Sequence, residues 1–398
     1  MSGHLMGVYN RAPLEVDRGR GARLWSVDGT EYLDCVQGIS TNGLGHAHPV
    51  LIEAVKEQAE KLWHVSNIFK IPGQEELADR LTESSFADVV FFTNSGTEAV
   101  ECALKTARKY HAANGQPERI DIYGFDGAFH GRTYGAINAA ANPSYTEGFG
   151  PKMQGFHQLK WGDHEALKAA IAEPNCAAII VEPVQGEGGC RAMPDVCLRG
   201  LRELCDQHGV LIIFDEVQCG MGRSGKLWAH EWAGMAPDIM AVAKALGGGF
   251  PIGACLATTE AAKGMTVGAH GSTFGGNPLA MAVGLAAFNA INSDAILGNV
   301  NEIAGYLKQQ LHGLKERFPD VIEDVRGKGL LIGLKLVPNN REFMGWARDE
   351  QHLLIAGGGD NGVRMLPPLN LTLDEAREAV ERLERTCEFA RARVKAVA

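Results

Sequence analysis

Two charged residues follow short apolar segments, where a ligand site is to be expected. Asp215 comes directly after residues 210–214, a β-branched run typical of a strand buried on both faces. Lys244 comes after a second such run, 238–243, and precedes three glycines at 247–249. Ligands of open α/β sheets bind at the carboxyl ends of the strands. Both side chains are therefore predicted to face one site.

The two side chains combine a nucleophile with an acid. Removing an ammonium group from water lowers its pKa, and the neutral amine can form a Schiff base with an aldehyde. A carboxylate can keep a pyridine nitrogen protonated, so that the ring acts as an electron sink. Lys244 and Asp215 therefore suit pyridoxal phosphate as a cofactor. From these residues alone, an ordinary strand-end aspartate and a solvated lysine are the alternative.

A second segment, 89–107, is typical of a phosphate site. An apolar strand at 89–92 is followed by a short turn and by a helix that opens at Gly96. The N–H groups and the dipole at a helix start attract anions, and glycine permits a close approach. Ser95 and Thr97 can add hydroxyl donors. Taken alone, the segment is equally compatible with a capped helix that binds nothing.

A third segment combines an aromatic ring with an arginine. Phe129 and Arg132 follow a predicted strand at 120–123. The ring can stack on a planar cofactor, while the guanidinium group can bind a substrate carboxylate in a forked geometry. Core packing for Phe129 and a surface ion pair for Arg132 are the alternatives.

The composition narrows the class of protein. The 398 residues carry a net charge of −10, which argues against a nucleic-acid or anionic-membrane partner. No apolar run approaches the ~18 residues of a membrane span, and the first residues lack the pattern of a signal peptide. The nine cysteines form no CxxC pair, and His46 and His48 have no third ligand in view, so no metal site is predicted. We expect a cytoplasmic protein with reduced thiols.

The order of the elements predicts an α/β fold. Strands near residues 89, 120, 177, 210 and 239 alternate with helices, as in a mostly parallel, helix-covered central sheet. A hairpin is expected around Asp28-Gly29 within 20–36. After residue 295, charged helices at 299–317 and 373–393 flank strand-like runs at 329–336 and 362–366. We therefore expect a large cofactor-binding domain over 51–290 and a smaller α+β domain formed by 1–50 and 291–398.

These segments together resemble the class III aminotransferases of the fold-type-I pyridoxal-phosphate superfamily. The resemblance extends from about residue 15 to 390. Its motifs are NSGTEA (94–99), FHGR (129–132), VEPVQGEGG (181–189), FDEVQCGMGRSG (214–225), AKALGGGFPIG (243–253) and GSTFGGNPLA (271–280). LGHAHP (44–49) and LWHVSN (62–67), together with FHGR and QGEGG, look most like the branch of this family that acts on acetylornithine.

The resemblance implies a role for each site residue. Lys244 would bind the cofactor covalently and carry the proton, and Asp215 would pair with the pyridinium nitrogen. The remaining cofactor contacts would come from Ser95, Gly96, Thr97, Phe129, Val217, Gln218 and Thr273. Thr273 would come from a second subunit, which implies a homodimer. Arg132, with Ser272 nearby, would hold the substrate carboxylate.

The resemblance also places Arg364 beside the reacting carbon of 2-oxoglutarate, with Glu187 opposite it. The implied activity is transfer of the δ-amine of N2-acetylornithine to 2-oxoglutarate in arginine biosynthesis. The segment 337–361 matches the family less clearly, so the acyl group stays open. Succinylornithine, ornithine, 4-aminobutyrate and succinyl-diaminopimelate are the alternative amine donors.

Two other classes of protein fit the sequence less well. A nicotinamide-dependent dehydrogenase would need a GxGxxG motif after the first strand, with an acidic residue ~20 positions later. The sequence lacks that combination. A catalytically silent paralogue is disfavoured because Lys244, Asp215 and the phosphate loops are all intact.

Overall fold

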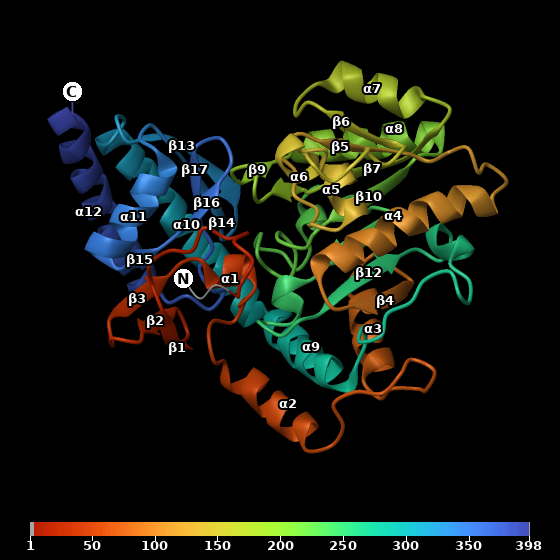
Figure 1. Ribbon diagram of the computed structural model, residues 1–398, viewed down its shortest axis with the longest axis horizontal. Helices are drawn as coiled ribbons and strands as arrows, with labels where there is room; N and C mark the ends of the chain where they lie inside the picture. The colour runs from red at the N-terminus through yellow and green to blue at the C-terminus, as the bar shows by residue number, and fades with distance from the viewer. Residues whose placement is uncertain (1–3, 398) are drawn as a thin grey trace.

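The computed structural model describes the backbone of residues 4–397 and the side chains of residues 4–393. Seven strands form the central sheet: β4 (Val89–Thr93), β5 (Asp121–Phe125), β6 (Phe156–Leu159), β7 (Cys176–Val181), β10 (Leu211–Asp215), β11 (Ile239–Val242) and β12 (Gly253–Ala257). Their order across the sheet is β4-β12-β11-β10-β7-β5-β6 (Figure 1).

The central sheet is parallel except at one strand. β10 pairs in parallel with β11 and β7, and β5 pairs in parallel with β7 and β6, whereas β12 is antiparallel to both of its neighbours. Every residue of β7 and β10 is buried. Such burial on both faces explains why these strands are continuous apolar runs. The predicted mostly parallel, helix-covered sheet is confirmed.

Helices cover the sheet and link its strands. α4 packs against β11 and β12, and α8 packs against β10. Gly209, with φ +63°, ends α8 as glycine commonly ends helices. The helices are α1 (Gln37–Ser40), α2 (Pro49–Ala59), α3 (Gln74–Glu83), α4 (Gly96–Ala113), α5 (Tyr134–Ala140), α6 (Pro143–Thr146), α7 (His164–Ala172), α8 (Asp195–His208), α9 (Pro278–Ile291), α10 (Asp294–Arg317), α11 (Asn340–Gln351) and α12 (Leu373–Val397).

The two ends of the chain lie together, away from the central sheet. Figure 1 shows the N-terminal strands in red beside the C-terminal helices and strands in blue. β1 (Val16–Arg20), β2 (Arg23–Ser26) and β3 (Glu31–Asp34) form a sheet with β15 (Leu353–Leu354). The predicted hairpin corresponds to the antiparallel pair of β2 and β3.

A second small sheet follows α10. It has the order β13-β14-β17-β16, with β13 (Ile322–Lys328), β14 (Leu331–Leu336), β16 (Ala356–Gly358) and β17 (Gly362–Met365). The short strands β8 (Val184–Gln185) and β9 (Arg191–Ala192) pair with each other. The domain boundaries at residues 50 and 290 stay a prediction, and residues 1–3 and 398 of those segments lie outside the described residues.

One predicted strand begins later than expected. The run at 329–336 starts with a turn between β13 and β14, so that the strand itself begins at Leu331. Gly329 lies in this turn with φ +61°, and a Cβ there would lie 2.4 Å from the backbone carbon of Ser224. Both the left-handed backbone and the close approach therefore require glycine.

Among the described residues, no single helix is long and apolar enough to cross a membrane. α9 and α10 pass such a test only as a pair, across a bend of 62°. Most of α9 is buried, because it packs against α2 and α3.

Candidate active site

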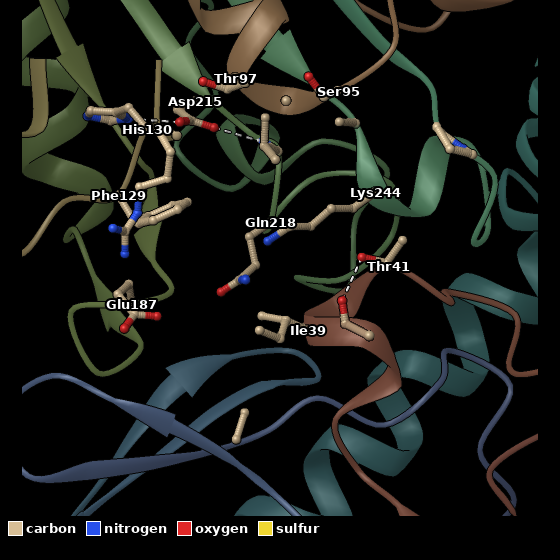
Figure 2. A pocket seen from close by; sticks show the side chains of 18 of the residues that line it. Ile39, Thr41, Ser95, Thr97, Phe129, His130, Glu187, Asp215, Gln218 and Lys244 are labelled. Carbon is tan, nitrogen blue, oxygen red and sulfur yellow. Dashed lines mark hydrogen bonds and ion pairs between the residues drawn. The ribbon is translucent and has the colours of Figure 1, made fainter. Parts of the chain in front are cut away.

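A cavity of about 1240 Å³ opens at the edge of the sheet where the parallel strands end. It is lined by the segments that follow β4, β5, β7, β10 and β11, together with β17 and α1. Figure 2 shows Lys244, Asp215, Gln218, Phe129 and Glu187 around this space. The structure brings together eleven of the predicted site residues here: Ser95, Gly96, Thr97, Phe129, Arg132, Glu187, Asp215, Val217, Gln218, Lys244 and Arg364.

Lys244 carries the amine of this cavity. It lies two residues beyond β11 and has φ +50°, a conformation that is costly for a side chain with a Cβ. Burial lowers the pKa of its amine to about 8, and the charge of Arg364 acts in the same direction. About a tenth of the amine is therefore neutral, and nucleophilic, at pH 7, far more than for a lysine with the ordinary pKa of about 10.4.

We expect Lys244→Met to stabilise the apoprotein at pH 7 by roughly 3 kcal/mol, about 1.4 kcal/mol for each unit by which the lysine pKa is lowered. The folded state binds fewer protons than the unfolded state between pH 8 and the ordinary lysine pKa of about 10.4. The free energy of unfolding of the unchanged protein therefore rises with pH through that window. The variant lacks this amine and should not show the rise. Urea unfolding of the apoprotein at both ends of the window measures it. The exposed Lys61→Met is the control, and an apoprotein weakened by Lys244→Met contradicts the argument.

Asp215 is the acid at the end of β10, and both of its oxygens are engaged. The imidazole Nδ1 of His130 lies 2.8 Å from Oδ2, and the N–H of Val217 donates to Oδ1 at 3.0 Å (Figure 2). Burial works to lower the pKa of His130, but the hydrogen bond and charge of Asp215 outweigh it and raise that pKa. The two hydrogen bonds hold the Asp215 carboxylate in place at the end of β10.

A second buried carboxyl, Glu182, lies at the end of β7. One oxygen accepts the N–H of Phe129 at 3.0 Å, and the other accepts the N–H of Gly186 at 3.1 Å. Burial, together with the negative charge of Asp215, raises the pKa of Glu182 to about 7. Through its two hydrogen bonds, Glu182 fixes the loop that carries Phe129 and the loop that carries the QGEGG segment.

The start of α4 forms the phosphate-sized end of the cavity. The Ser95 hydroxyl donates to the Glu98 carboxylate at 2.8 Å and accepts the Glu98 N–H at 3.4 Å, so this side chain caps the helix. A Cβ on Gly96 would lie 2.7 Å from Cγ1 of Val217. The Thr97 hydroxyl lies 2.9 Å from that of Thr133. The backbone N–H groups of Gly96 and Thr97 at this helix start can donate hydrogen bonds to an anion.

Two arginines line the cavity. Arg364, on β17, donates to the carboxylate of Glu187 at 2.6 Å and to the carbonyl of Gly357 at 2.8 Å. Its Nη1 also donates to Gln218 at 3.4 Å. Arg132 has no ion-pair partner among the described residues, and it lies against aromatic rings instead. Of these two arginines, one therefore has no acidic partner among the described side chains, and the other is neutralised by a carboxylate.

Two predicted residues do not reach the cavity of this chain. Ser272 accepts hydrogen bonds from the N–H of Gly275 at 2.9 Å and from the amide of Asn94 at 3.3 Å. Thr273 is exposed and lies outside the cavity lining. Their roles at the phosphate and the substrate stay predictions, and the role of Thr273 depends on a second subunit.

Sequence reasoning assigned no role to His130, Glu182 or Tyr145, which also line the cavity. The position of Glu182 directly after a buried strand was a usable signal, as it was for Asp215. His130 lies inside the FHGR motif without a pattern that indicates its partner. Tyr145 lies on the short α6 and gives no sequence signal. No cluster of three metal-ligating side chains occurs within residues 4–393.

The residues present fit pyridoxal phosphate. A desolvated amine, a buried acid, an aromatic ring and a helix start with a Val217–Gly96 contact surround one cavity. When bound, this cofactor supplies an electron sink for breaking bonds at the carbon that carries the amine. Lys244 would hold it, Asp215 would bind its ring nitrogen, and the first turn of α4 would bind its phosphate.

The α/β fold and this cavity define a pyridoxal-phosphate enzyme of fold type I. Residues 7–387 match the family described as Aminotransferase class-III. The chain belongs to this family, whose members depend on pyridoxal phosphate.

Individual proteins agree with this assignment. Acetylornithine aminotransferase 2 of Caulobacter vibrioides is 74% identical over 394 residues, which cover 99% of this chain and 97% of that protein. The ornithine aminotransferase structure of Toxoplasma gondii ME49 has a TM-score of 0.94 at 30% identity and covers 98% of this chain and 94% of its own. A PLP-bound amine transaminase from an uncultivated Pseudomonas species has a TM-score of 0.89 at 32% identity, covering 97% and 98%.

Proposed function

We propose that this enzyme transfers the δ-amine of N2-acetyl-L-ornithine to 2-oxoglutarate, giving N-acetylglutamate 5-semialdehyde and L-glutamate, a step of arginine biosynthesis. The relative from Caulobacter vibrioides bears the name of this activity at 74% identity. The observation that carries the proposal is the pair of arginines in one cavity: within residues 4–393, Arg132 has no acidic partner, whereas Arg364 is neutralised by Glu187. Both substrates carry a carboxylate far from the reacting carbon, and only 2-oxoglutarate carries one beside it.

The residues divide the work of the reaction. Arg132 binds the distal carboxylate of either substrate and so sets which carbon approaches Lys244. The amine of Lys244, kept partly neutral by its pKa of about 8, takes the proton from that carbon. It would then pass this proton to the cofactor. Asp215, held in place by His130 and Val217, would pair with the ring nitrogen of the cofactor. Phe129 and Val217 both line the cavity, where they would enclose the ring.

The two half-reactions make opposite demands on Arg364. An arginine beside the reacting carbon serves 2-oxoglutarate, but it would also draw the α-carboxylate of acetylornithine to the wrong end. The Glu187 carboxylate covers Arg364 in this structure. Arg364 is buried and anchored on Gly357, whereas the Glu187 side chain is 42% exposed. Glu187 is therefore the partner that swings aside when 2-oxoglutarate enters.

We expect Arg364→Ala to slow the 2-oxoglutarate half-reaction by about 10- to 150-fold, the value of one charge-assisted hydrogen bond. The acetylornithine half-reaction should be largely spared. Single-turnover absorbance spectra measure each half separately. Arg132→Ala is the matched comparison and should slow both halves. Equal losses in both halves for Arg364→Ala would remove the gating role and leave Arg364 as a structural ion-pair partner.

The identity of the amine donor is tested by a panel. Rates with acetylornithine, succinylornithine, ornithine, 4-aminobutyrate and succinyl-diaminopimelate are compared under identical conditions with 2-oxoglutarate as acceptor. The proposal predicts the highest kcat/KM for acetylornithine. A higher value for ornithine or 4-aminobutyrate, which lack an acylated α-amine, would replace it with a related ω-aminotransferase activity.

We further propose that the active unit is a cytoplasmic homodimer that works on small molecules, with a large domain at 51–290 and a smaller domain from both ends. Large apolar side chains that a partner could cover are exposed on loops near the phosphate end: Trp63 (65%), Ile68 (81%), Phe69 (60%) and Phe274 (58%). Thr273 is next to Phe274 in the sequence. A partner subunit bound at this surface would therefore be in contact with Thr273. Light scattering of the purified protein measures the mass, and a monomer that is fully active would contradict the proposal.

A further inference from the structure

The guanidinium group of Arg132 is held by rings rather than by acids. Its Cζ lies 3.9 Å from the ring centroid of Tyr145 and 5.5 Å from that of Phe129. The two rings contact each other edge to face, with centroids 5.9 Å apart. Among the described side chains, no carboxylate forms an ion pair with Arg132, although the residue is exposed. We call Phe129 and Tyr145 the aromatic bracket of Arg132.

This kind of support leaves the arginine ready for a ligand. A ring packed on the face of a guanidinium group does not use its N–H donors, which point outward in the plane. A carboxylate partner would occupy those donors in a forked geometry. Restricting a long side chain before binding also removes part of the entropy that binding would otherwise cost.

From this geometry we propose that Tyr145 is the positioning residue that orients Arg132 toward the distal carboxylate of both substrates. The inference rests on the proposed function and extends it to a residue without a sequence signal. Tyr145 lies on α6, whose start is capped by the Asn142 side chain. Phe129, the other half of the bracket, is tied through its N–H to the buried Glu182. One ring therefore comes from the segment after β5 and the other from α6.

The aromatic ring of Tyr145, and not its hydroxyl group, makes the contact with Arg132. Burial, together with the negative charge of Glu187, raises the pKa of the phenol, which stays neutral at physiological pH. No hydrogen bond joins this hydroxyl to another of the described residues. A phenylalanine at this position keeps the aromatic face, whereas a leucine or methionine removes it.

The test compares Tyr145→Phe with Tyr145→Leu in the holoenzyme. Leucine should raise the KM of both acetylornithine and 2-oxoglutarate by about 3- to 30-fold, as expected for a lost cation–π contact, while kcat changes little. Phenylalanine should retain the KM values of the unchanged enzyme. The Kd of glutarate, a dicarboxylate without a reacting carbonyl, should rise by the same factor in calorimetry. If leucine prevents folding, Tyr145→Met keeps the bulk without the ring and replaces it.

Two controls separate positioning from packing. Tyr123→Leu makes the same change at a ring that stacks on His157 outside the cavity, and it should leave the glutarate Kd unchanged. In an Arg132→Ala background, Tyr145→Leu should add no further loss, because the tyrosine acts only through the arginine.

Several results would overturn the inference. Additive losses in the double variant, equal effects of phenylalanine and leucine, or a fall in kcat at constant KM would each do so. Failure of the proposed function shows differently. If acetylornithine is not a substrate of the unchanged enzyme, the glutarate Kd still reports on Tyr145 and Arg132.

Discussion

Replacing Lys244 by alanine is expected to abolish multiple-turnover transamination while the protein stays folded. In the proposed function, one amine serves both as the attachment point of the cofactor and as the group that moves the proton. Loss of general acid–base catalysis alone costs about 10²- to 10⁴-fold, and loss of the attachment point adds to it, so kcat should fall by at least about 10⁴-fold. Folding should survive because the buried amine, with its pKa lowered to about 8, is itself a cost to the folded state.

Steady-state rates and circular dichroism measure the two parts of this prediction. Lys244→Arg is the matched control, since it keeps a positive charge but supplies no nucleophile, and it should be as inactive as the alanine variant. A small primary amine added to Lys244→Ala should restore part of the proton transfer. If Lys244→Ala turned over many equivalents of substrate without added amine, another group would have to be the nucleophile.

Replacing Asp215 by asparagine should slow the reaction far more than it weakens cofactor binding. The variant keeps the shape of the side chain but removes the charge that favours a protonated ring nitrogen. Removal of one well-placed electrostatic group costs about 10²- to 10³-fold in kcat. The helix start at Gly96 and the amine of Lys244 still bind the cofactor, so its Kd should change by less than about tenfold.

Absorbance titration of the apoprotein with cofactor gives the Kd, and single-turnover spectra give the rate. Glu182→Gln provides a matched comparison, because it removes a nearby buried carboxyl that does not bind the ring nitrogen. It should affect the rate less than Asp215→Asn does. A near-unchanged rate in Asp215→Asn would remove Asp215 from the chemistry, and a lost cofactor would make it a binding residue instead.

The sheet was predictable where strands are buried on both faces. β7, β10 and β11 are continuous apolar runs, and this local pattern was enough to locate them. β12, with the sequence GACLA, was missed because glycine and alanine carry weak strand propensity, and its antiparallel direction has no signal in the sequence. β6 was missed because it mixes polar and apolar residues within FHQL.

The site was predictable in part for a related reason. Asp215 and Lys244 lie at strand ends, and parallel strands end at one edge, so local patterns were enough to bring them together. The bond between Glu187 and Arg364 joins residues 177 positions apart, and only the resemblance to a family suggested it. The contact of Tyr145 with Arg132 depends on how the short α6 packs beside the cavity, which no local sequence pattern encodes.

Chemical trapping of the cofactor tests the central claim most directly. Borohydride reduction of the holoenzyme makes a link between the cofactor and its amine permanent, and peptide mass spectrometry then locates the modified residue. We expect a yellow protein that is bleached by borohydride and that carries the cofactor on the peptide containing Lys244. A cofactor attached to another lysine, or no covalent attachment at all, would contradict it.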